Sequence, residues 1–288
     1  MSLDEVNAQV KAGTENLILW HNIPYIFFFL LFQLVMKEKP DTPPSAVAAV
    51  PASELSFCTS FKELWANKNF LRLVLNYAVI YGVSCGIGAS LSNLLNPFGF
   101  SPSQISMIGG CCLVAGVTAA LVVGSVLDHT ASYKKTHIAL SFLVFAAVIL
   151  IIVVLQTSDG NLVGMILATT FLGISFVSLF PASLSYGAEL TFPLQAGLVN
   201  ACMNFSGQIL AFLFTALTVW ITDIDASDES YVTDQDIQSR KNHSFTTLYV
   251  IAGSTFLAFV LAIFIKEDLR RVNYKVDISG DQITDKTT

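Results

Sequence analysis

Seven long apolar stretches dominate this 288-residue chain, and the gaps between them carry nearly all of its charge. Each stretch is close to the roughly 20 residues that a helix needs to cross the hydrocarbon core of a bilayer. A lipid-exposed backbone must satisfy its own polar groups, and the short alternating segments of a membrane barrel are absent, so we expect helices. The stretches are residues 18–36, 70–95, 105–127, 136–155, 162–184, 197–221 and 245–265.

Composition supports the same interpretation, because 53% of the residues are hydrophobic and only 12% are charged. The sequence therefore predicts an all-α integral membrane protein whose surroundings are the lipid bilayer, and a soluble helical bundle is disfavoured. The net charge of −6 lies in the loops, chiefly in the acidic gap before the last stretch, and gives no reason to expect nucleic acid as a partner.

Basic residues fall in alternate gaps, after the first, third and seventh stretches. Of the 15 Lys and Arg residues, only Lys11, Arg240 and Lys241 lie on the other side. Cytoplasmic loops are enriched in Lys and Arg, so we expect the amino terminus outside and the carboxyl terminus inside. We therefore expect a multi-pass protein of the plasma membrane.

The gap after the first stretch is longer than most of the later ones and is rich in Pro and Ala, which is typical of an extended linker. The chain then divides into five parts. They are an extracellular segment at 1–17, a lone transmembrane helix at 18–37, a cytoplasmic linker at 38–69, a six-helix unit at 70–266 and a cytoplasmic tail at 267–288.

The sequence lacks the motifs that would indicate an enzyme or a seven-helix receptor. No set of Ser, His and Asp, no metal cluster and no nucleotide-binding loop is visible, and the five cysteines form neither a disulfide framework nor a metal pattern. We therefore expect no catalysis, no metal and no cofactor. A seven-helix receptor shares the topology, but no Asp-Arg-Tyr follows the third stretch and no Asn-Pro-x-x-Tyr lies in the last.

The gap after the third stretch holds a motif, formed by Gly124 and Asp128 and followed by Lys134 and Lys135. It matches the Gly-x-x-x-Asp and basic cluster between the second and third helices of each half in the major facilitator superfamily. A glycine permits close helix approach, and an aspartate at the membrane edge can pair with a basic group or a helix start. We expect these four residues to gate the protein, although topology signals alone also produce such a pattern.

Further motifs resemble the feline leukaemia virus subgroup C receptor-related transporters, a branch of that superfamily. Glu189 opens a Glu-x-Thr-aromatic-Pro pattern, and Asn204, Ser206 and Gln208 form an Asn-x-Ser-x-Gln pattern. Three more stretches agree in order and spacing: KEKPDTPPS at 37–45, LDHTASYKK at 127–135 and IKEDLRRVN at 265–273. The resemblance runs from about residue 18 to residue 273, with departures at Ala89 and Ala196.

This resemblance implies a partial major facilitator fold. The family has two six-helix halves, and the KEKP stretch follows its sixth helix, so the seven stretches are expected to be equivalent to helices 6–12. The expected partner is a missing amino-terminal half or a full-length relative. Two alternatives stay open: an accessory half-transporter without transport of its own, and the product of an incomplete gene.

The resemblance also implies transport of a small organic cation such as choline or ethanolamine, with haem as the alternative. Tyr81, Gln208 and Asn204 are expected to bind the substrate, because an aromatic face holds a quaternary ammonium and an amide binds a hydroxyl. Glu189 is expected to act as a gate. Each also has a plainer reading, since aromatic pairs pack in membrane helices and amides link helices.

Overall fold

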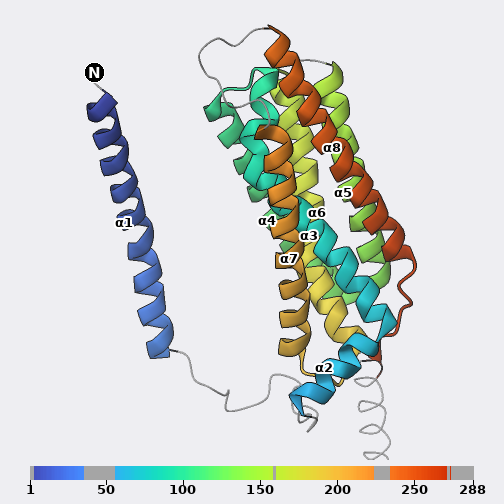
Figure 1. Ribbon diagram of the computed structural model, residues 1–288. Helices are drawn as coiled ribbons and strands as arrows, with labels where there is room; N and C mark the ends of the chain where they lie inside the picture. The colour runs from blue at the N-terminus through green and yellow to red at the C-terminus, as the bar shows by residue number, and fades with distance from the viewer. Residues whose placement is uncertain (1–2, 36–55, 158–159, 224–233, 271–272, 274–288) are drawn as a thin grey trace, which may run out of the picture. The chain divides into compact units, whose positions relative to one another are not determined.

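The computed structural model describes residues 3–35, 56–157, 160–223, 234–270 and 273, and the elements within them are helical (Figure 1). Seven helices are long and apolar enough to cross a membrane, namely all of the α-helices except α2. They confirm the predicted all-α membrane protein. The helices are α1 Leu3–Val35, α2 Phe57–Ala66, α3 Lys68–Leu95, α4 Pro102–Thr130, α5 Tyr133–Thr157, α6 Leu162–Thr191, α7 Ala196–Asp223 and α8 Asp234–Ile263, with a 3-10 turn at Asn96–Phe98.

Local capping explains where several helices begin. The Asn67 side chain accepts hydrogen bonds from the backbone of Asn69 and Phe70 at the start of α3, and Ser101 forms a capping box with Gln104 before α4. Two helices are longer than the apolar stretches that predicted them: α6 continues past residue 184 at its end, and α8 starts before residue 245. Apolar residues mark the part that suits a bilayer, whereas a helix continues into water wherever its backbone bonds are satisfied.

Helix α1 belongs to a compact unit of its own, residues 1–50, and is described by itself. Every side chain from residue 11 to residue 35 is exposed, including a continuous aromatic and aliphatic run around Phe27, Phe28 and Phe29. A helix that is apolar on all sides is stable only against lipid or other helices. Helix α1 is long and apolar enough to span a membrane, and its role as a lone transmembrane helix stays a prediction.

Part of the expected linker at 38–69 is helical. Residues 38–55 lie outside the described residues, but α2 occupies 57–66 within the second unit. Leu64 is fully buried and Ser60 is 6% exposed, while Phe57 and Phe61 face outward. An extended linker is therefore the wrong prediction for this segment, because one face of α2 gains burial against the bundle.

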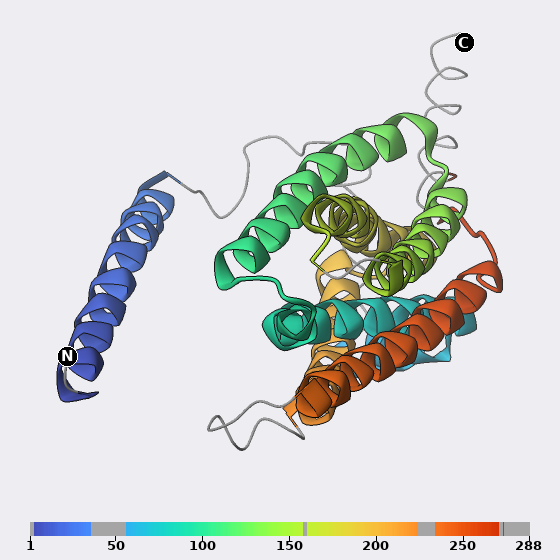
Figure 2. The same cartoon turned by 90° about the horizontal axis from the view of Figure 1, so that it is seen from above.

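Helices α3 to α8 form a six-helix bundle within residues 51–288, and α2 crosses one end of it (Figure 1). Helix α3 packs against α7 and α8, α6 packs against α4 and α5, and α5 packs against α8. Viewed from above, α6 lies between α4 and α5, and α8 runs along one side of α3 (Figure 2). Helices α3 and α6 each pack against several neighbours and carry many of the buried side chains of the bundle.

The outer faces of α4 and α7 remain apolar and exposed. On α4, Val114 and Leu121 are 71% and 73% exposed, and on α7, Phe212 and Trp220 are 73% and 67% exposed. Exposed apolar surface on this scale marks contact with lipid or with further helices. These faces of α4 and α7 are therefore suited to contact with lipid or with additional helices.

Candidate functional site

The seam between α3 and α7 carries two hydrogen bonds of the same kind, one helical turn apart. The Tyr77 hydroxyl donates to Asn204 Oδ1 at 2.9 Å, and Gln208 Nε2 donates to the Tyr81 hydroxyl at 2.9 Å. The two tyrosines on α3 are four residues apart, and so are the two amides on α7, so on each helix the two side chains lie on the same face. The structure thus brings together Tyr81, Gln208 and Asn204, the three residues expected to bind substrate.

Glycine makes this seam possible. Gly207 is buried between the two tyrosines, and a Cβ there would lie 3.1 Å from Tyr77 Cε1 and 3.2 Å from Tyr81 Cδ1. On the facing helix, a Cβ at Gly82 would lie 2.8 Å from the backbone of Leu210. Small residues allow membrane helices to approach closely. The tyrosine rings therefore lie close to the backbone of α7 at Gly207.

Aromatic rings line one side of the seam. The rings of Tyr77 and Tyr81 stack with centroids 5.7 Å apart and an interplanar angle of 20°. Phe180 on α6 tilts against Tyr81 at 5.3 Å and meets Tyr77 edge-on at 6.0 Å, and Phe176 continues the cluster one turn away. Aromatic faces of this kind carry partial negative charge and attract cations.

Exposure within the seam is graded. Tyr77 is 1% exposed, Tyr81 is half-buried, and Asn204 and Gln208 are exposed. Among the described residues, Gln208 Oε1 accepts no hydrogen bond, whereas the Asn204 amide donates to the backbone oxygen of Asn200 at 2.9 Å. The free amide oxygen can accept a hydrogen bond from a hydroxyl or an amine of a ligand.

A cavity of about 450 Å³ borders the seam at Tyr81. Its walls come from α3, α4, α5 and α6 with one residue of α8, and they are almost entirely apolar. Tyr81, Phe176 and Phe180 form its aromatic end. The volume lies within the range of pockets that hold small organic ligands.

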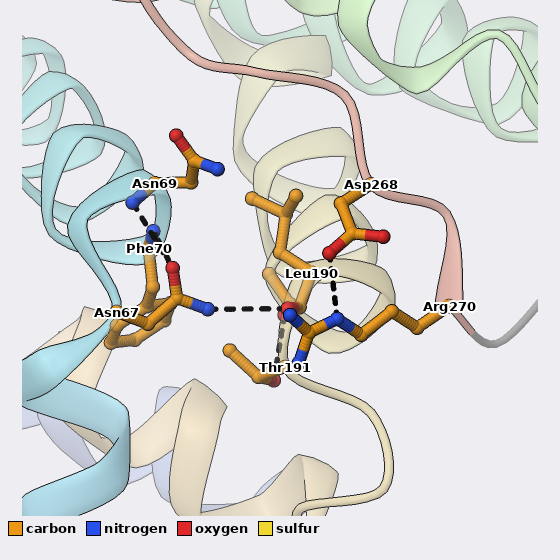
Figure 3. Close-up of polar contacts among 8 residues, drawn as sticks. Asn67, Asn69, Phe70, Leu190, Thr191, Asp268 and Arg270 are labelled. Atoms are coloured by element: carbon orange, nitrogen blue, oxygen red, sulfur yellow. Dashed lines mark hydrogen bonds and ion pairs between the residues drawn. The ribbon is translucent and has the colours of Figure 1, made fainter.

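A second set of polar contacts ties helix ends together where α2, α3, α6 and the residues after α8 meet (Figure 3). Asn67, which caps α3, also donates from Nδ2 to the backbone oxygen of Leu190 at 3.3 Å. Thr191 donates to the Gly187 carbonyl at 2.8 Å, and Arg270 pairs with Asp268 at 2.7 Å on an exposed surface. Asn67 therefore links the start of α3 to the end of α6.

Comparison with known families decides the identity of this helical unit. Residues 16–215 match the family described as the Major Facilitator Superfamily. The chain belongs to this superfamily. Its similarity to named members is consistent with the resemblance predicted from the motifs.

Three facilitator relatives illustrate that similarity. The Choline/ethanolamine transporter flvcr2a of Danio rerio is 28% identical over 262 residues, which cover 88% of this chain and 51% of the relative. For FLVCR1 of Felis catus the identity is 26%, with 89% of this chain and 43% of the relative covered. For FLVCR2 of Rattus norvegicus it is 27%, with 84% and 42% covered. The chain spans about half the length of the curated relatives it matches, or less.

The facilitator motif of Gly124 and Asp128 lies at the end of α4, before α5. Asp128 is exposed, Lys134 is half-buried and Lys135 is exposed. Within the described residues none of these three side chains has a hydrogen bond or an ion pair. A Cβ at Gly124 would meet no atom within 4 Å, so Gly124 makes no close helix contact inside this unit.

Close approach on α4 occurs two turns earlier, at Gly116. A Cβ there would lie 2.7 Å from the carbonyl oxygen of Gly173 and 2.6 Å from a methyl group of Val177 on α6. The remaining residue expected to gate, Glu189, lies in the last turns of α6 and is 4% exposed. Glu189 is therefore buried, whereas Asp128 and Lys135 are exposed.

Three residues of this facilitator site went unrecognised at the sequence level. Phe180 completes the aromatic cluster, and its spacing of four from Phe176 was an available signal. Asn67 stands directly before an apolar stretch, where a helix cap is expected. Gly207, between Asn204 and Gln208, gave no signal of its contact with α3, because that contact depends on how the two helices pair.

Proposed function

We propose that this chain forms the substrate-binding second half of a facilitator that moves a small organic cation of the choline or ethanolamine type. The observation that carries the proposal is the aromatic cluster of Tyr77, Tyr81 and Phe180 beside Gln208. A quaternary ammonium cannot donate hydrogen bonds, so aromatic faces are its natural partners. Gln208 Oε1 supplies an acceptor for the substrate hydroxyl or amine.

The relatives' names support the same substrate class, because each is a choline/ethanolamine transporter. Haem is less well supported. Its propionates call for basic groups, and neither the seam residues nor the described walls of the cavity include Lys, Arg or His.

The proposed mechanism is alternating access in a complete two-half protein, with a first half facing the exposed surfaces of α4 and α7. Tyr81 lies at the middle of α3, where a site can be reached from either side of the membrane. Asp128 and Lys135 are exposed and Lys134 is half-buried, so these side chains can contact the other half in one state and release it in the other. Glu189 is proposed to act as a gate from the end of α6.

Uptake of radiolabelled choline tests this proposal, using this chain alone and this chain placed behind the first five helices of the zebrafish relative. In the joined protein we expect Tyr81→Ala with Gln208→Ala to lower uptake at least tenfold, because the cation–π contact and the amide acceptor are lost together. Tyr81→Phe keeps the aromatic face and is expected to retain most of the uptake.

A matched control exists elsewhere in the bundle. Gln156 Nε2 donates to the Tyr249 hydroxyl at 2.8 Å between α5 and α8, with the same chemistry as the Gln208 and Tyr81 pair but outside the seam. Gln156→Ala with Tyr249→Ala should leave choline uptake unchanged. Unchanged uptake in the Tyr81 and Gln208 double variant, at equal surface expression, would reject the proposed site.

A further inference from the structure

The cavity beside Tyr81 is elongated along the bundle. Its walls on α3 begin at Tyr81 and end at Leu95, and on α5 they run from Val144 to Leu155. At 1.5 Å of rise per residue, the α3 wall is roughly 20 Å long. A choline-sized molecule fills only a small part of such a space. The cavity therefore suits a ligand with a long, narrow apolar part.

The walls offer water few partners. The Ser84 hydroxyl donates to the Ile80 carbonyl at 2.7 Å, and the Thr169 hydroxyl donates to the Met165 carbonyl at 2.8 Å, so both are used within their own helices. The other lining side chains are mostly Leu, Ile, Val and Met. A buried water needs two to four polar partners, so this lining favours an apolar occupant.

The cavity is continuous with the proposed substrate site, because Tyr81 and Phe180 belong both to its lining and to the aromatic cluster. We propose that it accepts the alkyl chain of an amphiphilic quaternary amine whose cationic head lies against Tyr81 and Gln208. The inference rests on the proposed function and extends its substrate class to single-chain cations. A methylene group takes up about the volume of a water molecule, ~30 Å³, so the cavity holds a chain of roughly 10 to 15 carbons.

Direct binding to the purified 288-residue chain in phosphatidylcholine nanodiscs tests the proposal. The probes are radiolabelled octyl- and dodecyltrimethylammonium, with tetramethylammonium and choline as probes of the head group, and binding to protein-free nanodiscs is subtracted. We expect each added methylene to tighten binding by roughly fourfold until the cavity is filled, because apolar surface leaves water.

A pair of glycines provides a matched test of position. Gly88 lines the cavity and Gly110 does not, and a Cβ at either would meet no atom within 4 Å. We expect Gly88→Leu to weaken dodecyltrimethylammonium binding at least tenfold without changing tetramethylammonium binding, and Gly110→Leu to change neither. If Gly88→Leu does not fold, Gly109→Val provides the same test, because Gly109 also lines the cavity and its Cβ would lie at an ordinary 3.5 Å from Leu91.

The outcomes separate this inference from the proposed function. Choline binding without any gain from the alkyl chain would overturn the inference and leave the proposed function standing. Binding of the dodecyl probe that Gly88→Leu removes, without binding of choline or tetramethylammonium, would support the chain site and count against the proposed function. Equal binding of the dodecyl probe by the Gly88 and Gly110 variants would overturn the inference, since the probe would then be held elsewhere.

Discussion

Two helix pairs of the bundle, α3 with α7 and α4 with α6, achieve close approach through glycine but use it differently. Between α4 and α6, Gly116 and Gly173 place backbone against backbone, and a Cβ on Gly173 would overlap the carbonyl oxygen of Cys112. Between α3 and α7, Gly82 serves the same purpose, but Gly207 faces tyrosine rings rather than backbone. The α4 and α6 pair therefore has main-chain contacts at both glycines, whereas the α3 and α7 pair combines a main-chain contact at Gly82 with side-chain contacts at Gly207.

From this difference we expect the α4 and α6 contact to hold the bundle and the tyrosine seam to be the one that a ligand uses. Hydrogen bonds between membrane helices contribute only about 0.6 kcal/mol on average. The two tyrosine bonds of the α3 and α7 seam are therefore a small part of the stability, although they are its clearest polar feature. Substitution of the backbone contact should damage the fold, and substitution of the polar contact should damage binding.

The largest effect is expected from Gly173→Ala. The added methyl group cannot fit beside Cys112 unless α4 and α6 move apart, and overpacking in a tight core costs on the order of 3 kcal/mol or more. We expect little folded protein, or a clearly lower midpoint of thermal unfolding measured by circular dichroism in detergent.

Gly110→Ala is the matched control on α4, because an added Cβ there would meet no atom within 4 Å. Alanine is the better helix former, so this variant should be neutral or more stable by up to about 1 kcal/mol. Similar unfolding midpoints for the Gly173 and Gly110 variants would break the comparison, since the close contact would then not hold the bundle.

Apolar stretches predicted the seven long helices because a bilayer demands length and hydrophobicity, and both are visible in the sequence. Helix α2 was not predicted, because its stability depends on the burial of Leu64 against the end of the bundle, and the sequence does not show that contact. Helix ends were also missed, since Glu189 and Thr191 continue α6 after the apolar residues end.

The candidate site was predicted in part. Family motifs pointed to Tyr81, Asn204 and Gln208, and the structure brings these three together, although their role in binding stays a prediction. Phe180 and Gly207 depend on which helices are neighbours, and periodicity within one helix carries no such information. Gly124 shows the reverse case, a motif glycine for which the described residues provide no close helix contact.

A smaller effect on stability, with a larger one on binding, is expected from Gly207→Ala. The new Cβ would lie 3.1 to 3.3 Å from the rings of Tyr77 and Tyr81, which can shift by a few tenths of an ångström. We expect a loss of about 1 kcal/mol in stability and a severalfold or greater weakening of choline binding, measured on the same preparation. A loss of stability as large as that of Gly173→Ala would mean that the two helix pairs are packed alike.

The smallest effect is expected from Tyr77→Phe, which removes the hydrogen bond to Asn204 and keeps the ring against Phe180. The buried hydroxyl leaves with its bond, and Asn204 is exposed, so no buried polar group is left without a partner. The cost should be about 0.6 kcal/mol, close to that of Tyr249→Phe, which removes the comparable bond to Gln156 on the outer helices. Thermal unfolding of both variants measures this. A Tyr77→Phe loss above about 2 kcal/mol, with Tyr249→Phe unchanged, would show that the polar seam also holds the bundle, because its bonds would then exceed what membrane helices ordinarily gain from them.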